Sequence, residues 1–264
     1  MLYFVFTVDG DWDEYFRPHG DRAPDARRIM PLIDREIDFA SRNLGGRFIH
    51  FVHASPVAGD FFLGSGLISR WQRIERGGGS IGVHSHEEDP GKLDDSITSL
   101  SNGLKHAGFL PIAYRGGYMA FDAKSIPILE ANGLKLDFSC DPGRHLVRNG
   151  RTVSDWRGAS DNFYRMSRED HRKPGDSGVF EVPLGSAGKT KLYPEINSLL
   201  SIWAAAKALK RSAADKDVIV SVMAHTYDFA RSGMVRKLKW TLWILKKYGR
   251  FINAEEALEL IRRA

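Results

Sequence analysis

Paired acidic and imidazole side chains follow two of the apolar runs in the sequence. Asp9 and Asp11 flank one glycine after the run Leu2–Val8, and His84 and His86 are separated by one residue at the end of a second run. Residues i and i+2 of an extended strand point to the same side, so each pair can face one cavity. Carboxylates and imidazoles bind divalent ions such as zinc, and they also act as acids and bases. An Asp-Gly-Asp sequence also suits a turn, but the preceding apolar strand favours a functional site.

Three more apolar runs end in groups that could take part in the same chemistry. The first leads into the segment 115–118, which contains Arg115, two glycines and Tyr118. Asp137 and His225 end two later runs. A buried histidine at a strand end is more often structural than catalytic, and we expect His50 and His53, on yet another run, to be structural as well. The single cysteine, Cys140, excludes an internal disulfide framework and any zinc site built from several thiolates.

Short apolar runs alternate with segments of helical periodicity, which predicts strand–helix units around a parallel sheet. The expected strands are Leu2–Val8, Arg47–His53, Ser80–His84, Leu110–Tyr114, Leu134–Ser139, Gly178–Pro183 and Asp217–His225. The clearest helical patterns are Asp25–Leu44, Asn197–Ala214, Met234–Tyr248 and Ala254–Arg263. Seven such strands suit a barrel better than an open sheet, and a parallel barrel carries its working residues at the C-terminal ends of its strands.

The length of 264 residues and the composition, 42% hydrophobic and 27% charged, are typical of a soluble globular chain with one domain over residues 1–264. Residues 141–176, rich in Arg, Gly, Ser and Asp, interrupt the alternation, and we interpret them as a long excursion from that domain. The N-terminal run lacks a basic segment and a cleavage site, so we interpret it as a first strand and expect a cytoplasmic protein.

The order of the motifs resembles that of the polysaccharide deacetylases, the NodB-homology family also known as carbohydrate esterase family 4. The resemblance extends from residue 7 to residue 225. The matching segments are Thr7-Val8-Asp9-Gly10-Asp11, Gly82-Val83-His84-Ser85, Tyr114-Arg115-Gly116-Gly117-Tyr118, Asp137-Phe138-Ser139 and Val222-Met223-Ala224-His225. It implies an α/β fold, a distorted (β/α) barrel of about seven parallel strands. Two positions depart from the family pattern: Glu88 replaces a second metal-binding histidine, and Cys140 replaces a tryptophan that lines the sugar groove.

The resemblance also implies catalytic roles. Asp9 would be the general base, with Arg115 beside it. His225 would protonate the leaving amine, and Asp137 would hold or tune that histidine. The backbone N–H of Tyr118 would donate a hydrogen bond to the oxyanion of the tetrahedral intermediate.

The same resemblance implies a divalent metal ion, for which imidazole and carboxylate ligands favour zinc. Asp11 and His84 match two of the ligands in the family pattern. The third ligand is open between His86, which an extended H-x-H segment places on the same side as His84, and Glu88.

By resemblance the protein would be a hydrolase of carbon–nitrogen bonds that removes the N-acetyl group from an amino sugar. The expected substrate is a glycan or a lipid- or nucleotide-linked precursor of a surface polysaccharide. Two alternatives stay open. The replacement of tryptophan by Cys140 and the long excursion would permit a related metal amidohydrolase acting on a small non-sugar amide. The irregular second motif would permit a glycan-binding relative without catalytic activity.

The net charge of +5 is expected to be mostly a solvated surface. No nucleic-acid-binding motif accompanies it, so nucleic acid is not an expected partner. The segment Met234–Tyr248 combines leucines at helical spacing with five basic residues and with Trp240 and Trp243. Such a helix either packs its apolar face against the barrel or lies on an anionic membrane surface. The sequence carries no signal for the oligomeric state.

Overall fold

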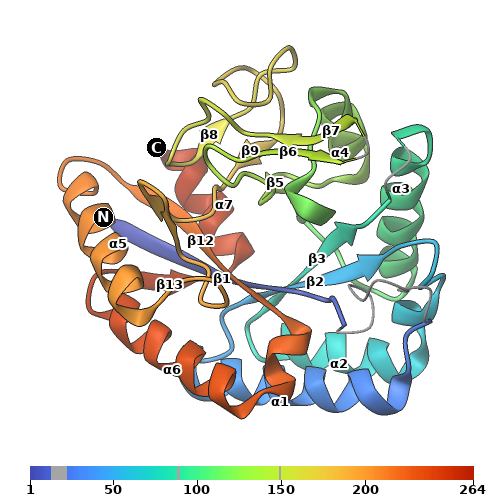
Figure 1. Ribbon diagram of the computed structural model, residues 1–264. Helices are drawn as coiled ribbons and strands as arrows, with labels where there is room; N and C mark the ends of the chain where they lie inside the picture. Colours follow the sequence, from blue (N-terminus) through green and yellow to red (C-terminus); the bar gives the residue numbers. More distant parts are fainter. Residues whose placement is uncertain (13–22, 88–89, 149) are drawn as a thin grey trace.

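The computed structural model describes residues 1–12, 23–87, 90–148 and 150–264, which form a curled parallel sheet with helices around its outside (Figure 1). The strands of the main sheet are β1 (Leu2–Asp9), β2 (Ile49–Ala54), β3 (Ser80–Ser85), β4 (Ala113–Gly116), β5 (Leu136–Asp137), β8 (Tyr164–Arg165), β9 (Phe180–Glu181), β12 (Val218–His225) and β13 (Arg250–Ile252). The helices are α1 (Ala26–Leu44), α2 (Ser65–Arg76), α3 (Pro90–His106), α4 (Ile126–Asn132), α5 (Leu199–Ser212), α6 (Ser232–Lys246) and α7 (Ala254–Arg263). Within these residues, no helix is long and apolar enough to cross a membrane.

Seven strands follow one another in parallel in the order β12, β1, β2, β3, β4, β5 and β9. Beyond β9, a parallel bridge pairs Leu184 with Ser221 of β12, so the chain returns from the last strand to the first. The predicted distorted barrel is therefore confirmed. Because all seven strands run the same way, their C-terminal ends meet at one rim.

Alternation along the strands separates an inner from an outer core. On β1, Phe4, Phe6 and Val8 pack against the surrounding helices. Tyr3 and Val5 point the other way, into an inner cluster that also contains Leu258 and three other residues of α7. This inner cluster fills the barrel from the N-terminal ends of the strands. Successive side chains alternate between faces, so the inward direction continues to Thr7 and Asp9 at the opposite end.

Local signals explain several element boundaries. Asp25 accepts a hydrogen bond from the backbone N–H of Arg27 and caps α1, and Gly45 ends that helix in a left-handed conformation with φ of 61°. Three differences from the predicted elements concern short segments. β4 begins at Ala113 rather than at Leu110, which is exposed, and β5 has only two residues. β13, of three residues, lies between two helices and was not predicted, because so short a run carries no detectable period.

The excursion over residues 141–176 contains secondary structure of its own. A two-stranded antiparallel sheet forms from β6 (His145–Arg148) and β7 (Arg151–Asp155), and β8 pairs antiparallel with β9 at the edge of the main sheet. A second small antiparallel pair, β10 (Ser186–Ala187) and β11 (Thr190–Lys191), follows the bridge to β12. The β6–β7 sheet lies in the upper part of Figure 1.

Candidate active site

The register of the parallel sheet brings the predicted site residues together at the rim. Asp9 is the register partner of His225, and His84 is the partner of Arg115. His53, on β2, is the partner of His84 on the other side. All five side chains are buried, with at most 8% of any of these residues exposed. Residues that are distant in sequence thus become neighbours because their strands are adjacent.

Four buried residues could hold a metal ion. Asp11, His53, His84 and His86 each offer a ligand atom, and these atoms lie within 4.8 Å of one another. From Asp11 Oδ1, the distances are 3.5 Å to His84 Nε2, 3.3 Å to His86 Nε2 and 2.7 Å to His53 Nδ1. Of the two residues considered for the third ligand, His86 therefore lies in the group, whereas Glu88 lies outside the described residues.

These three distances distinguish the residues that could bind a metal ion from one that only orients a metal ligand. Two atoms bound tetrahedrally to zinc at its usual bond lengths are about 3.3 Å apart. The contacts of His84 and His86 with Asp11 match that separation. The contact of His53 is shorter and has the length of a hydrogen bond to a carboxylate. The geometry therefore fits Asp11, His84 and His86 as ligands, with His53 orienting Asp11.

Hydrogen bonds around the group support the same assignment. His84 Nδ1 lies 2.9 Å from the carbonyl oxygen of Arg115 and donates to it, so Nε2 is the nitrogen that faces Asp11 and would bind a metal. Burial lowers the pKa of His53 to about 4, although the hydrogen bond with Asp11 opposes this shift. The neutral ring of His53 therefore donates a hydrogen bond from its Nδ1–H to Asp11 Oδ1. His53 was expected to be structural; its position at the end of a strand beside His84 is the signal that sequence reasoning underused.

Asp9 is held by an ion pair rather than by the histidine group. Arg115 Nη1 lies 2.6 Å from Asp9 Oδ1, and the same nitrogen donates to Thr7 Oγ1. Burial by itself raises the pKa of Asp9, but the charges of Arg115, His84 and His225 outweigh burial and leave the pKa below its ordinary value. Asp9 is therefore ionised at neutral pH and can accept a proton.

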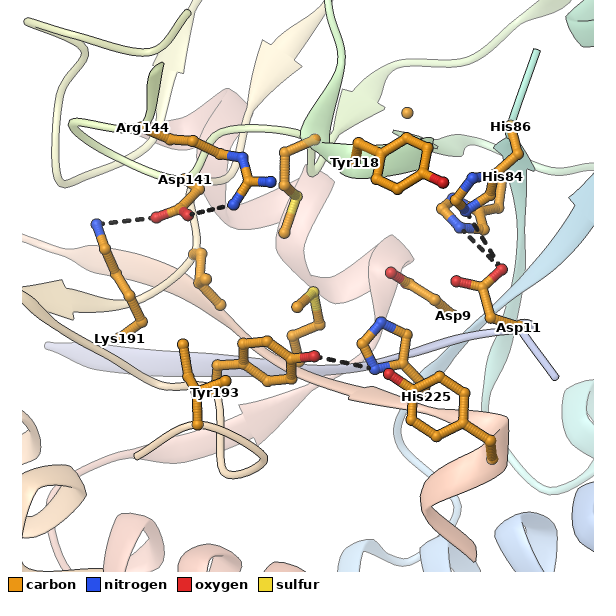
Figure 2. Close-up of a pocket in the computed structure, with 16 residues that line it drawn as sticks. Asp9, Asp11, His84, His86, Tyr118, Asp141, Arg144, Lys191, Tyr193 and His225 are labelled. Atoms are coloured by element: carbon orange, nitrogen blue, oxygen red, sulfur yellow. Dashed lines mark hydrogen bonds and ion pairs between the residues drawn. The ribbon is translucent and has the colours of Figure 1, made fainter. Parts of the chain in front are cut away.

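His225 has a different set of partners. Its Nδ1 lies 3.3 Å from the hydroxyl oxygen of Tyr193 (Figure 2). The same nitrogen lies 3.5 Å from Glu195 Oε2, and the imidazole ring stacks on Tyr227. Burial by itself lowers the pKa of His225. The hydrogen bond to Glu195 and the negative charge of Asp9 raise this pKa and outweigh burial, so the net shift is upward. His225 thus tends to be protonated beside an ionised Asp9, the arrangement of a general acid next to a general base.

Glu195 occupies the place that the sequence predicted for Asp137. Its carboxylate accepts hydrogen bonds from Tyr193 at 2.5 Å and from Tyr227 at 2.9 Å, and Arg231 forms an ion pair with it at 3.1 Å. Although partial burial opposes the shift, these contacts and the charge of His225 hold the pKa of Glu195 far below its ordinary value. Glu195 lies in the segment between β11 and α5, where no periodicity or motif singles it out, so sequence reasoning missed it.

Asp137 belongs to a separate buried network. Its Oδ1 accepts a hydrogen bond of 2.6 Å from Ser139 Oγ, which in turn accepts one of 2.8 Å from the backbone N–H of Gly116. Glu181 is its register partner on β9, and burial raises the pKa of both carboxyl groups, that of Asp137 to about 6. The structure therefore differs from the predicted pairing of Asp137 with His225. Asp137 instead supports the turn that follows β4.

That turn presents Tyr118 to the site in a strained conformation. Tyr118 and Met119 both have left-handed φ values, 56° and 59°. An added Cβ at Gly116 would lie 1.9 Å from the carbonyl oxygen of Ala120, so only glycine fits there. The Tyr118 ring meets the edge of His86 and carries the Arg148 guanidinium over its face, 4.4 Å from the centroid. Such strain in non-glycine residues is typical of functional sites.

Two cavities meet at this turn. The first, of about 220 Å³, is lined by Asp9, Asp11 and His225, and its far wall carries an ion-paired group of Asp141, Arg144 and Lys191 (Figure 2). The second, of about 1050 Å³, lies between the turn and the β6–β7 hairpin. His86 and Tyr118 line both cavities. The excursion over residues 141–176 thus forms walls on both sides of the site.

Cys140 packs in the core rather than in the pocket. It is completely buried, and burial together with nearby acidic groups raises the pKa of its thiol far above the ordinary value. A protonated, inaccessible thiol does not act as a nucleophile. At this position the side chain therefore lies in the core and lines neither cavity.

Comparison with solved structures places this architecture among known folds. A polysaccharide deacetylase from Mycobacterium smegmatis superposes with a TM-score of 0.63 at 16% identity, over 99% of this chain and 90% of that chain. A polysaccharide deacetylase from Pseudomonas aeruginosa PAO1 gives 0.65 at 11% identity, over 99% and 91%. Puue allantoinase gives 0.64 at 11% identity, over 98% and 89%.

No protein-family model and no curated protein matches the sequence. The likeness therefore rests on three-dimensional structure, and it agrees with the fold that the five sequence motifs imply. The chain has the NodB-type (β/α) barrel fold of the polysaccharide deacetylases.

Proposed function

We propose that the protein is a metal-dependent hydrolase that removes the N-acetyl group from an amino sugar in a glycan or glycan precursor. The observation that carries the proposal is the pairing of an ionised Asp9 with a His225 of raised pKa beside three groups with the spacing of zinc ligands. A base, an acid and a metal-binding group at one cavity are what amide hydrolysis needs.

Asp11, His84 and His86 would hold the ion, with zinc the ion that best suits one carboxylate and two imidazoles. A bound divalent ion would polarise the acetyl carbonyl and acidify a water molecule. His53 keeps Asp11 in place through its hydrogen bond, and the carbonyl of Arg115 keeps Nε2 of His84 available.

Other residues of the site would transfer the two protons and stabilise the oxyanion. Asp9 takes a proton from the attacking water, and Arg115 holds the carboxylate in position for it. The backbone N–H of Tyr118 donates to the oxyanion of the tetrahedral intermediate. His225, kept protonated by Glu195, gives its proton to the departing nitrogen. Water and amide are consumed, and acetate and a free amine are released.

The two adjoining cavities support a substrate that extends beyond one small group. The acetamido group would enter the smaller cavity beside Asp9, and further sugar units would lie past Tyr118 in the larger one. A small non-sugar amide is the second candidate, because an allantoinase has a similar fold and because the buried Cys140 stands where the family pattern has a tryptophan. A cytoplasmic precursor of a surface polysaccharide is the natural source of an acetylated glycan for this enzyme.

The proposal is tested by measuring metal content together with acetate release from acetylated amino-sugar oligomers and from small amides. Asp9→Asn and His225→Ala should each lower turnover by roughly 10²–10⁴-fold while metal content and fold persist. Asp95→Asn and His106→Ala, at exposed positions of α3, are matched controls that should retain turnover. Release from small amides alone would move the assignment to the second candidate. Glycan binding by a metal-free protein without turnover would instead indicate a non-catalytic relative.

A further inference from the structure

A stripe of apolar side chains lies exposed along α5 and the residues before it. Leu200 and Trp203 are three residues apart on α5 and therefore share one face, with 72% and 41% of each residue exposed. Ile196, in the turn before the helix, is 67% exposed. The opposite face of α5, which includes Ile202 and Leu209, is buried in the outer core. The exposed stripe is thus not used to pack the helix onto the barrel.

α6 shows the same division. Its three leucines at helical spacing, Leu238, Leu242 and Leu245, are buried against the barrel. Trp240 and Trp243 are about half exposed, and their rings meet edge to face at 5.5 Å. The leucines therefore account for the packing of α6, whereas the tryptophan pair is left on the surface. Exposed tryptophans next to one another are uncommon on surfaces that contact only water.

Charge on these two helices is entirely positive. Neither α5 nor α6 contains an acidic residue. Their basic residues and the one that follows α6 are Lys207, Lys210, Arg211, Arg236, Lys237, Lys239, Lys246 and Lys247. Lys247 Nζ lies 3.4 Å from the ring centroid of Trp243, and Lys207 Nζ lies 5.5 Å from that of Trp203. Two of the three tryptophan rings thus have a lysine ammonium beside them, the combination that suits the interface of an anionic membrane.

This surface reaches the mouth of the catalytic cavity. α5 and α6 are in contact and lie together at the lower left of Figure 1. Ile196, the first residue of the exposed stripe, also lines the cavity that contains Asp9 and His225. An apolar chain lying along the stripe would therefore pass directly to the catalytic groups.

We propose that the α5–α6 surface, defined by Ile196, Leu200, Trp203, Trp240 and Trp243 with their basic neighbours, docks on an anionic lipid bilayer. A second copy of the chain is the less suitable occupant, because it would bring a second positive surface against the first. If the protein has the proposed function, docking would present an acetylated sugar carried on a membrane lipid to the cavity beside Ile196. The docking itself does not depend on catalysis.

The test measures co-sedimentation of the full chain with vesicles of phosphatidylcholine alone or mixed with phosphatidylglycerol, at low and high salt and without substrate. Binding is expected to the mixed vesicles and should weaken as salt rises. The Trp240→Ala/Trp243→Ala double variant should bind roughly tenfold more weakly or worse. Lys239→Gln/Lys247→Gln should reduce both the binding and its salt dependence.

Leu110→Ala and Arg76→Gln provide controls at an exposed apolar and an exposed basic position outside this surface, and both should bind as the parent chain does. Absence of binding to mixed vesicles at low salt overturns the proposal, as does equal binding by the tryptophan variant when its circular dichroism matches that of the parent. Dimerisation in sedimentation velocity that the tryptophan variant abolishes, without vesicle binding, assigns the surface to a second copy instead. Turnover of a water-soluble acetylated oligomer is measured separately on the parent chain, and its absence would overturn the proposed function while leaving the vesicle result intact.

Discussion

Two aspartates separated by one residue have different neighbours, and the different roles proposed for them rest on that difference. Asp9 faces the Arg115 guanidinium, whereas Asp11 faces three imidazoles. Both carboxylates are buried, and burial by itself would raise the pKa of each. Opposite charges reverse that effect at both positions. Both carboxylates are therefore ionised, as the proposed roles of a general base and a metal ligand require.

The ligand assignment predicts graded effects on metal binding. Asp11→Asn, His84→Ala and His86→Ala should each remove most of the bound ion, because each takes away one of three protein ligands. His53→Ala should weaken affinity by about 10–100-fold without abolishing binding, as is usual for residues that only orient a ligand. Elemental analysis and competition titration with a chelator measure both effects. Full occupancy in His86→Ala together with complete loss in His53→Ala would exchange the two roles.

Glu195 predicts a shift in the pH dependence of turnover. As the proposed general acid, His225 must be protonated, and the carboxylate of Glu195 helps to raise the pKa of His225. Glu195→Gln removes that charge, so the pKa of His225 falls and the alkaline limb of the pH–kcat profile moves to lower pH. The limb reports the coupled cluster rather than one residue, so its displacement is the readout. Glu259→Gln, at an exposed position of α7, is the control and should leave the profile unchanged. If the alkaline limb does not move in Glu195→Gln, Glu195 does not raise the pKa of His225.

At the scale of elements, two very short strands suffice to form part of the barrel wall, because hydrogen bonds of their side chains add to the backbone pairing. β5 and β9 have two residues each, yet they place Asp137 beside Glu181 in the barrel wall. The backbone N–H of Cys140 also donates to Glu181 Oε1 at 3.0 Å. The Ser139 hydroxyl transmits the position of Asp137 to Gly116 and so to the strained turn at Tyr118. A buried acid pair thus supports the turn that carries Tyr118.

This acid pair predicts a dependence of stability on pH. The pKa of Glu181 is raised far above its ordinary value, chiefly by burial and then by the charge of Asp137, and that of Asp137 is raised to about 6. A carboxyl with a raised pKa in the folded state stabilises that state relative to unfolding at low pH, and the contribution is lost as pH rises through the folded pKa. The loss begins above the ordinary pKa of a carboxyl group and continues past pH 6.

Glu181→Gln should remove this loss, because an amide keeps an acceptor for Cys140 and a donor for Asp137 without ionising. We expect its melting temperature to match that of the parent chain near pH 4 and to exceed it at pH 8, where ΔΔG is on the order of 1–3 kcal/mol. Differential scanning calorimetry across this range measures the difference. A variant that is less stable than the parent at pH 8 would show that the pair is not a source of strain in the folded state.

At the scale of the molecule, the apolar packing that stabilises the barrel and the polar residues of the candidate site lie at opposite ends of the barrel. The helix α7 and the inner apolar cluster fill the N-terminal end, and polar residues from β1, β2, β3, β4 and β12 occupy the other end. A metal bound there would connect the ends of β1 and β3, so it would bind the folded chain and not the unfolded one. Metal binding is therefore linked to global stability.

Removal of the metal should lower the melting temperature. Binding at 100–1,000 times the Kd contributes about 3–4 kcal/mol, which for a domain of this size corresponds to roughly 5–15 °C. Scanning fluorimetry with a chelator, followed by addition of zinc, measures the loss and the recovery. Asp11→Asn should show neither response. Equal sensitivity to the chelator in Asp11→Asn and in the parent would place the ion elsewhere.

Much of the site could be predicted from the sequence because a buried parallel strand is a continuous apolar run, and the polar residue that ends it must lie at the barrel rim. Asp9, Asp11, His84, Arg115 and His225 all satisfy that rule. The seven parallel strands themselves were predicted for the same reason, but the bounds of the short β4, β5 and β9 differ from those predicted and β13 was not predicted. These features depend on local pattern, which each segment carries within itself.

The tertiary structure decided which groups pair. His53 supports Asp11 because β2 lies beside β3 in register, and Glu195 holds His225 because a segment without periodicity passes the rim. Similarly, leucine and tryptophan at helical spacing form one apolar face in a sequence, and only packing shows that the leucines of α6 are buried while Trp240 and Trp243 remain exposed. Pairing and burial depend on contacts between distant segments, and no single segment contains that information.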